Sequence, residues 1–571
     1  MAGLGAFAAW LGLCLARDRR SLPRTPLDAP LAWLAAAVLL SALFSLDKPV
    51  SLLGQYYSYS FGMLPWFLAA ALFYAAAASA AAPWRRVLAA AAAVGAALGL
   101  YGLLQRLGIE PLAGAAVLLP REEACGTGGS PIGLGAYLVL LLPAAVRLSL
   151  CDDSRGRLLG LCSAVLMGLC LLASDSFAAM LSGLAAGTLA VLLARPAALK
   201  RIDLKTAGWT LALAVLVGPV LAARLQRPPD EARLKTWAVA ARTFLHRPLS
   251  GSGPDTLMLA FRRYRTDDVI RVLGDRRGGI TANNDLIQVA ATLGLPGLAA
   301  YLFFLWGLAR LIRDALRDSG RRELAAAAGA AAAGLFIFAK YYALPPPVLI
   351  CAAAGVGLVA RKPGRGGPPS RERRLGAWAA LAGTGLACVL LARLCLADAA
   401  HARALIDLAR EDSAGAVAGM EKACRLAPQE MHYKVSLNRL LVELSQFRAP
   451  AEEPVRLSRA VEIGESSVRW HPGDPAAHNM LGVSLLLLSS QGGPDRLSEA
   501  QRALDRAQEL DPYFIPLWQA RLMLASKRND RRRFEELYGG LQRVAGLLPE
   551  DQKLPSLSSP EDMMRTQTPR P

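Results

Sequence analysis

Long apolar runs are the feature that most constrains the fold of this chain. About twelve of them are roughly 15 to 23 residues long, the length that an α-helix needs to cross the hydrocarbon core of a bilayer. In order, the runs are Ala2–Leu15, Leu31–Phe44, Leu64–Ala82, Val87–Leu104, Ile132–Val146, Leu158–Ala173, Phe177–Leu193, Ala207–Leu221, Leu286–Leu308, Leu324–Ala339, Leu344–Ala360 and Trp378–Leu396. Backbone polar groups inside a bilayer must be satisfied within the protein, so the runs predict an all-α, polytopic bundle of about twelve transmembrane helices.

The overall composition agrees with a membrane protein. Hydrophobic residues make up 54% of the 571 residues, charged residues only 19%, and a purely soluble chain of this length would be more polar. Several runs are short or rich in alanine, which leaves the number of helices open by one or two. The first run has no basic segment before it, so we expect it to span the membrane rather than to be a cleaved signal peptide.

Basic residues gather in alternate connecting segments. These segments are 17–24, 85–86, 147–157, 195–205, 310–322 and 361–374, whereas the intervening short segments hold few basic residues, such as Lys48, Arg106, Arg121 and Lys340. The positive-inside rule therefore places the N-terminus, Ala222–Asp285 and everything after Leu396 outside. A formal net charge of +19 would suit nucleic-acid binding in a soluble chain, but basic loops beside a membrane account for it here, and no nucleic-acid partner is expected.

The composition changes after the last apolar run. A basic Gly/Pro linker in residues 361–374 precedes the final transmembrane helix, and residues 361–396 together form this connecting unit. Residues 397–549 are helical and mixed in charge, with prolines 428, 472, 512 and 549 spaced 44, 40 and 37 residues apart. These spacings lie slightly above the 34-residue tetratricopeptide period, and Ala503–Leu524 is the best copy of the repeat. An irregular helical domain that ends its helices at proline is the alternative.

Two other features have little bearing on function. Residues 550–571 are polar and rich in proline, which predicts a disordered tail. The nine cysteines lie mostly within apolar runs, and no CxxC or metal-ligand spacing occurs, so we expect no metal site and no cofactor.

The segment between the eighth and ninth runs breaks the charge rule. From Arg233 to Arg277 it carries ten basic residues on the predicted outer side. Long translocated loops tolerate such charge, so a merely solvated loop is one explanation. The pattern favours a site instead, since Arg233 and Trp237 lie one helical turn apart and an apolar helix leads into a Gly/Pro turn. An arginine fork neutralises a diphosphate well beside a membrane, and it stabilises negative charge that develops on a departing phosphate.

Several segments resemble the O-antigen ligase family. RLKTWAVAARTFLHRPLSGSGPDTL at Arg233–Leu257 and ANNDLIQVAATLGLPGLAAYL at Ala282–Leu302 are similar to its hallmark, and Ser45–Gly62, Tyr101–Pro111, Gly126–Pro143 and Ser174–Leu181 resemble earlier pieces. The resemblance covers roughly residues 1–360, including the loop 222–285. It implies a glycosyltransferase that moves a glycan from a polyprenyl diphosphate carrier to a lipid, glycan or protein acceptor, at the outer face of a bacterial inner membrane.

The resemblance also implies roles for individual residues. The arginines of the external segment are candidate ligands of the donor diphosphate: Arg233, Arg242, Arg247, Arg262, Arg263 and Arg265. Arg233, Asn283 and Asp285 are the candidate catalytic residues. The structural motif comprises Trp237, Gly251, Gly253, Pro254, Asn284, Gln288, Gly294 and Gly297.

Two positions depart from the family pattern. Asn283 stands where the family usually has histidine, and Phe177 follows Ser176 where it usually has arginine. An asparagine cannot act as a general base. Either another group activates the acceptor, with Asp285, Asp255 and His246 as candidates, or catalysis depends on electrostatics and positioning. The third alternative is that activity is lost. A histidine placed like His246 is more often a structural interface residue.

Function remains open between two classes. The first is a transferase whose external repeats bind an acceptor or a partner protein, and the second is a non-catalytic scaffold that organises envelope-polysaccharide assembly through its repeats. In the first case we expect sugar rings to stack on three tyrosines, Tyr56, Tyr57 and Tyr59. The alternative is that these tyrosines form an ordinary interfacial belt. No nucleotide-binding loop occurs, and the spans show few intramembrane charges, so ATP-driven transport and secondary transport have no support.

Overall fold

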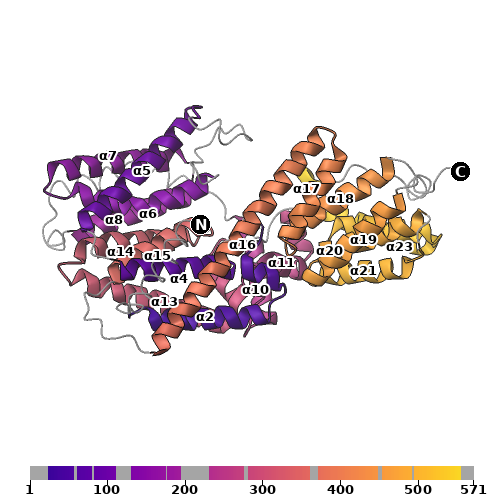
Figure 1. The fold of residues 1–571 in the computed structure, drawn as a ribbon, viewed down its shortest axis with the longest axis horizontal. Helices are drawn as coiled ribbons and strands as arrows, with labels where there is room; N and C mark the ends of the chain where they lie inside the picture. Colours follow the sequence, from indigo (N-terminus) through magenta and orange to yellow (C-terminus); the bar gives the residue numbers. More distant parts are fainter. Residues whose placement is uncertain are drawn as a thin grey trace.

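The computed structural model describes residues 24–56, 61–79, 83–110, 130–174, 176–194, 230–275, 281–360, 371–447, 453–491 and 494–553. Within these ranges the chain is helical and contains no strand, as the fold class predicted. Figure 1 shows a helical bundle formed by the N-terminal two-thirds of the chain and a stack of helices formed by the C-terminal third.

Ten of the predicted apolar runs form helices in the bundle. They are α2 (Asp28–Leu43), α4 (Met63–Ala78), α5 (Trp84–Arg106), α6 (Pro131–Ser149), α7 (Ser154–Ala173), α8 (Phe177–Ala194), α13 (Asp285–Leu316), α14 (Arg322–Phe338), α15 (Pro346–Ala360) and α16 (Arg371–Ala409). The other two runs, Ala2–Leu15 and Ala207–Leu221, lie outside the described residues. Five helices among those described are long and apolar enough to cross a membrane, at 84–106, 131–149, 154–173, 285–316 and 381–409, and four more are apolar but shorter. The predicted number of about twelve is therefore not confirmed.

The surface of α7 shows why a bilayer is the natural surrounding. Leu158, Leu161, Val165 and Leu169 recur every three or four residues along this helix and are between 38% and 63% exposed. A stripe of this kind is costly in water but is stabilised by contact with lipid tails. The opposite face packs into the core of the bundle, where Met167 and Cys170 are fully buried.

The basic segment between α8 and α13 folds into three helices. These are α10 (Glu231–His246), α11 (Leu257–Tyr264) and α12 (Asp267–Leu273). Asp230 caps α10 by accepting a hydrogen bond from the backbone N–H of Arg233 at 3.3 Å. Val239, Phe261 and Val269 bury one face of each helix in a shared apolar cluster. The segment is therefore a folded unit and not an open loop.

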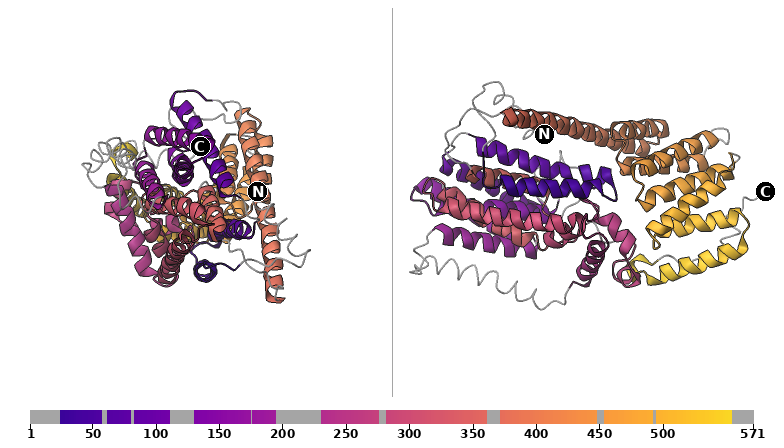
Figure 2. Two further views of the ribbon diagram at one scale, coloured as in Figure 1. Left: turned by 90° about the vertical axis from the view of Figure 1, so that its left-hand side faces the viewer. Right: turned by 90° about the horizontal axis from the view of Figure 1, so that it is seen from below.

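The C-terminal helices form a stack of antiparallel neighbours (Figure 2). They are α17 (Ser413–Leu426), α18 (Met431–Phe447), α19 (Glu453–Trp470), α20 (Pro475–Ser490), α21 (Leu497–Leu510), α22 (Ile515–Lys527) and α23 (Arg531–Leu547). Pro428, Pro472 and Pro512 lie in turns between consecutive helices, and Pro549 follows the last one, as the repeat pattern predicted. Apolar side chains from neighbouring helices, such as Leu457, Leu485 and Leu504, are buried between them.

Two predicted boundaries differ from the structure. The expected division at residues 396 and 397 falls inside α16, which continues without a break because neither Gly nor Pro interrupts its Ala- and Leu-rich sequence there. The predicted tail also begins too early. Glu550–Gln552 form a 3₁₀ turn, and Gln552 donates to the Leu273 carbonyl and accepts from the backbone N–H of Asp275, at 3.2 and 3.1 Å. The remainder of the tail, after residue 553, lies outside the described residues.

The repeat stack docks on the basic segment and on α3 (Lys48–Leu53). Arg265 makes charged hydrogen bonds to both carboxylate oxygens of Asp511, at 2.7 to 3.1 Å, and its side chain is 3% exposed. Asp47, which caps α3, pairs with His471 at 2.7 Å. Ile270 of α12 packs inside an apolar cluster of the repeats with Phe534. These contacts place the basic segment and the repeats at the same end of the bundle (Figure 1).

The side of the membrane on which this end lies is a testable prediction of the loop charges. In spheroplasts of cells expressing a cysteine-free protein, an impermeant maleimide is expected to label Glu231→Cys and Glu443→Cys, both exposed, but Ser319→Cys only after permeabilisation. The contacts between the repeats and the basic segment require the first two positions to behave alike. Labelling of Ser319→Cys alone in intact spheroplasts would reverse the orientation, whereas a difference between Glu231→Cys and Glu443→Cys would contradict the docked arrangement.

Candidate functional site

The start of α13 is held by polar side chains. Asn284 caps the helix, since its side-chain oxygen accepts hydrogen bonds from two backbone N–H groups of the first turn, at 3.1 and 3.3 Å. Gln288 accepts a hydrogen bond from the backbone N–H of Ala282 at 2.8 Å, and Trp237 of α10 donates its indole N–H to the carbonyl of the same residue, also at 2.8 Å. Asn283 adopts a left-handed φ of 49° in the turn between them. These bonds attach α10 to the first turn of α13.

A glycine turn docks into a break in α13. Gly294 has a φ of 69° inside the helix, which interrupts its hydrogen bonding and frees backbone carbonyls. The backbone N–H groups of Ser252 and Gly253 donate to two of these carbonyls, those of Ala291 and Thr292, at 3.0 Å each. Gly251 has a φ of 65°, and a Cβ atom there would lie 2.2 Å from the backbone of Thr292. Only glycine permits this approach.

The other members of the predicted motif close the same junction. A Cβ atom on Gly253 would lie 2.1 Å from the hydroxyl of Ser45, and the carbonyl of Pro254 accepts a hydrogen bond from Ser51 at 2.9 Å. A Cβ atom on Gly297 would meet that of Leu293 at 2.1 Å. The GxGP turn and the helix break therefore join the basic segment, α3 and α13 into one unit.

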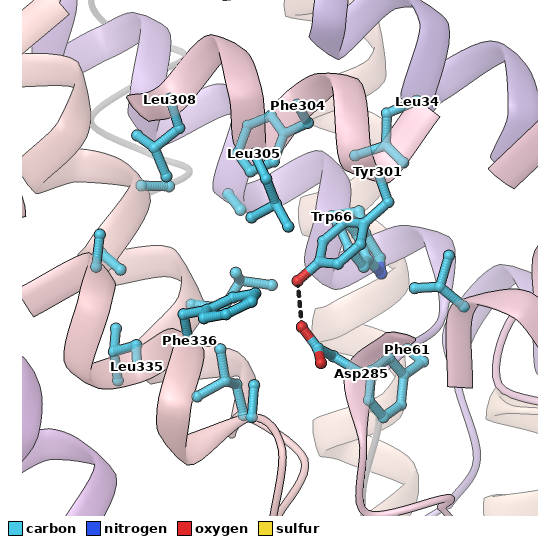
Figure 3. A pocket seen from close by; sticks show the side chains of 18 of the residues that line it. Leu34, Phe61, Trp66, Asp285, Tyr301, Phe304, Leu305, Leu308, Leu335 and Phe336 are labelled. Atoms are coloured by element: carbon cyan, nitrogen blue, oxygen red, sulfur yellow. Dashed lines mark hydrogen bonds between the residues drawn. The ribbon is translucent and has the colours of Figure 1, made fainter. Parts of the chain in front are cut away.

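An apolar cavity of about 200 Å³ opens beside this junction, between α2, α4, α13, α14 and α15. Figure 3 shows Trp66, Phe304 and Phe336 among its walls, with Asp285 and Tyr301 hydrogen-bonded inside it. The polar side chains collect where α13 begins: Thr281, Asn283, Asn284, Asp285 and Gln288. Gln288 is 1% exposed, and its amide nitrogen finds no hydrogen-bond partner among the described residues. A long apolar ligand with a polar head fits these walls.

Asp285 is the centre of the polar end. Tyr301 donates its hydroxyl to one oxygen of this carboxylate at 2.6 Å, and the Lys340 ammonium pairs with the other. Lys340 follows α14, and its ammonium also lies 3.8 Å from the centre of the Phe336 ring, in the cavity wall. An ammonium group is thus held beside a carboxylate at the mouth of an apolar chamber, where charge interactions are strong.

Arg233 approaches the same end from α10. Its guanidinium carbon lies 5.6 Å from the centre of the Tyr341 ring and 6.0 Å from that of Tyr342, which lines the cavity. The Nε–H of Arg233 is buried without a hydrogen-bond partner in the described part of the chain, and the nearest carboxylate oxygen, on Asp230, is 3.8 Å away. This guanidinium therefore retains hydrogen-bonding capacity for an anion.

The aromatic residue that departs from the family pattern lies next to Arg233. Phe177, at the start of α8, contacts Tyr341 edge to face, with ring centres 6.0 Å apart. The guanidinium of Arg233 lies over the same tyrosine ring. The position where the family pattern has arginine is therefore separated from Arg233 by the side chain of Tyr341, and the phenylalanine found there makes an apolar contact.

The helices α7, α8, α10 and α13 and the glycine turn come from one continuous part of the chain. Residues 162–302 match the O-antigen ligase family model, Wzy_C. The resemblance seen in the sequence is confirmed for this O-antigen ligase segment, which contains Arg233, the GxGP turn and the start of α13.

No curated protein matches the chain. Among solved structures, the crystal structure of yeast Tom70 aligns at 13% identity over 78% of this chain and 90% of that chain, with a TM-score of 0.18. Such a score does not establish a common fold, so this alignment carries no argument. The repeat assignment depends instead on the prolines and on the helix pairs described above.

The arginines predicted to bind the donor do not stay together. Of the six, Arg233 alone lies over a residue that lines the cavity, Tyr342, and the others make contacts elsewhere within the described residues. Arg242 donates to Thr266, Arg247 to the carbonyl of Phe44, and Arg262 to Asp474. Arg265 is buried against Asp511, and Arg263 lies over the ring of Tyr264. The six arginines therefore do not gather around one place in the described structure, and Arg233 is the candidate that remains beside the cavity.

The other predicted residues of the O-antigen ligase segment also separate. His246 is exposed, stacks on Tyr264 at 4.7 Å and lies outside the cavity, which agrees with the structural interpretation. Asp255 lines a second cavity, together with Tyr56. Tyr57 and Tyr59 lie outside the described residues. Asp285 thus remains as the carboxylate at the apolar cavity.

Lys340, Tyr301, Tyr341 and Tyr342 are site residues that the sequence analysis did not assign. Lys340 was visible as one of the few basic residues on the predicted outer side, and it stands in a short connection between two apolar runs. A cation that breaks the charge rule in so short a loop is a usable signal for an anion site. Tyr301 carries no such signal, because an aromatic residue inside an apolar run resembles any core residue.

Proposed function

We propose that this chain is a membrane glycosyltransferase that moves a glycan from a polyprenyl diphosphate carrier to an acceptor. The observation that carries the proposal is the apolar cavity whose polar end holds Asp285 and the unpartnered amide of Gln288. Lys340 is paired with Asp285, and Arg233 lies over the ring of Tyr342, which lines the cavity. In this proposal the polyprenyl chain occupies the apolar part, and the diphosphate lies at the polar end. The match of residues 162–302 to the O-antigen ligase family model supports the same class of reaction.

The proposed reaction is a single displacement. The oxygen of an acceptor hydroxyl forms a bond to the anomeric carbon of the glycan, and the bond between that carbon and the diphosphate oxygen breaks. Arg233 and Lys340 stabilise the negative charge that develops on the departing diphosphate. The hydroxyl proton passes to the Asp285 carboxylate, which takes the role that Asn283 cannot perform. Tyr301 holds that carboxylate in place.

A scaffold without catalytic activity is the second candidate. Asn283 and Phe177 favour it, because both stand where the family pattern has ionisable residues. The two candidates differ in how they respond to Asp285→Asn, which preserves shape but removes the basic carboxylate. A transferase loses its product, whereas a scaffold that is present at normal levels retains it.

The experiment that tests the proposal compares cells that lack the protein, cells with the native chain and cells with Asp285→Asn. Mass analysis of surface polysaccharide, lipid-linked intermediates and glycoproteins is expected to show that one glycan-bearing product disappears in the first and third strains while the lipid-linked donor accumulates. Normal product in the Asp285→Asn strain would support the scaffold, and an unchanged profile without the protein would exclude both roles.

Asn283→His restores the family residue and is expected to preserve or raise transfer. Histidine is among the residues that tolerate a left-handed backbone, so the φ of 49° at this position does not prevent the substitution. The rate of product formation in membranes, divided by the amount of protein, measures the effect. A loss of transfer in a protein of unchanged thermal stability would mean that Asn283 has its own role, such as the hydrogen bond that it accepts from Thr281 at 3.0 Å.

A further inference from the structure

A second cavity, of about 230 Å³, lies where the repeats meet the membrane domain. One wall comes from Asp47 to Tyr56, around α3, and another from Asp255 to Leu259, after the glycine turn. The repeats supply the third wall with residues 429–432 and with His471 and Asp474. Neither domain encloses this space by itself.

Buried contacts hold the walls together. His471 pairs with Asp47 at 2.7 Å, and both side chains are at most 3% exposed. The other ring nitrogen of His471 lies 2.8 Å from the carbonyl of Gln429, in the cavity wall. Burial acts to lower the pKa of His471, but the hydrogen bond and the charge of Asp47 together raise it, and a protonated ring donates to both partners. The cavity is thus a constructed feature of the junction.

Two carboxyl groups face the cavity with unused hydrogen-bonding capacity. Asp255 is 1% exposed, and one of its oxygens accepts from the backbone N–H of Gln55 at 2.7 Å, whereas the other has no partner in the described structure. Glu430 is 6% exposed, and its side chain makes no hydrogen bond within the described residues. A buried polar atom without a partner costs free energy, which a ligand bearing hydrogen-bond donors recovers.

The groups around these carboxyls suit a neutral ligand. Burial raises the pKa of Asp255 to about 7, against the lowering effect of the backbone groups of Gln55 and Phe61. Burial likewise raises the pKa of Glu430 to about 7, which the positive His471 opposes and the charges of Asp398 and Asp47 reinforce. Carboxyl groups that are half neutral at neutral pH attract a cation weakly but still accept, and when protonated donate, hydrogen bonds.

Apolar and aromatic surface completes the cavity. Tyr56 stacks on His432 with ring centres 4.4 Å apart and an angle of 14° between the rings, and Met258 and Leu259 lie on the opposite segment. Polar groups for hydroxyls beside apolar surface for ring carbons are the two requirements of a saccharide site. The backbone of Phe61 reaches Asp255, and its side chain lines the apolar cavity of the O-antigen ligase segment, so the two cavities adjoin.

We propose that this junction cavity binds a neutral saccharide through Asp255 and Glu430, and that the saccharide is part of the glycosyl acceptor. The acceptor role rests on the proposed function, whereas binding does not. The repeats would then contribute to substrate binding directly, because the site is incomplete without them.

The binding test uses the purified full-length chain in detergent and needs no donor. Saturation-transfer NMR is recorded with glucose, galactose, N-acetylglucosamine and, as the cationic counterpart, glucosamine. At least one neutral sugar is expected to bind, and Asp255→Asn and Glu430→Gln are each expected to weaken its binding by about tenfold or more, the loss expected for one or two hydrogen bonds to a polar group. Both changes preserve side-chain shape, and asparagine tolerates the φ of 55° at position 255.

Two matched variants separate the possible results. Glu443→Gln removes an exposed carboxylate on the neighbouring helix α18 and is expected to leave binding unchanged. Arg233→Ala, which tests the donor site, is also expected to retain saccharide binding, so that failure of the transferase proposal and failure of this one are distinguishable. The inference is overturned if no neutral sugar binds, if glucosamine alone binds, or if binding is equal in the native chain and in both cavity variants.

Discussion

Arg233→Ala is expected to reduce glycan transfer by about 10²- to 10³-fold, the effect of removing one preorganised donor from a developing oxyanion. The guanidinium is held over Tyr341 and Tyr342 with a free Nε–H, so its position does not depend on the substrate. Arg233→Lys should be nearly as damaging, because a single ammonium replaces neither the planar fork nor the stacking on two rings. The measurement is product formation from a lipid-linked donor in membranes that contain equal amounts of each variant.

The matched control is Arg271→Ala. This arginine lies in α12 of the same basic segment and is exposed, and its loss changes the net charge by the same amount. If long-range charge alone attracts the donor, the two alanine variants will be equally impaired. Normal transfer by Arg233→Ala would remove Arg233 from the donor site and shift support to the scaffold.

The helices of the bundle were predictable because their signal is local. A continuous apolar run has to be helical inside a bilayer, whatever its neighbours are, and this holds for each predicted run in the described residues. The predicted boundary at residue 396 falls inside α16, because the sequence of this helix changes there from apolar to mixed composition without any helix-breaking residue. A change in composition indicates where the chain passes from lipid to water, but it does not indicate where a helix ends.

The site was less predictable because its partners are distant in sequence. Lys340 and Asp285 are 55 residues apart, and Arg265 and Asp511 are 246 residues apart. The family motif grouped Arg233 with the glycine turn, yet it did not separate the arginine that lies over Tyr342 from those that contact the repeats, such as Arg262 and Arg265. The number of basic residues in a segment does not distinguish a guanidinium that is free to bind a phosphate from one that is already paired with a buried carboxylate.

Arg265→Ala is expected to release the repeats from the basic segment. The side chains of Arg265 and Asp511 are 3% and 0% exposed, and Asp275 shares the same guanidinium at 2.9 Å. Removing the arginine leaves Asp511 buried and uncompensated, which costs about 3–5 kcal/mol. Hydrogen exchange is the measurement, because amides of α12 that open with the junction should lose protection by roughly two orders of magnitude or more.

A double substitution separates the charge from the contact. Arg265→Met with Asp511→Leu fills similar volume and removes the fully buried carboxylate of Asp511, so that only Asp275, which is 14% exposed, loses its cationic partner. The protection of α12 is therefore expected to return toward that of the native chain. Arg263→Ala is the control, since it removes an exposed neighbour that lies over Tyr264 and does not reach the repeats. Unchanged exchange in Arg265→Ala would show that the packing of Ile270 into the repeat cluster holds the junction without the ion pair. Release in Arg265→Ala together with recovery in the double variant would establish that a buried charge, and not the area of contact, controls whether the repeat wall of the junction cavity stays against the other two.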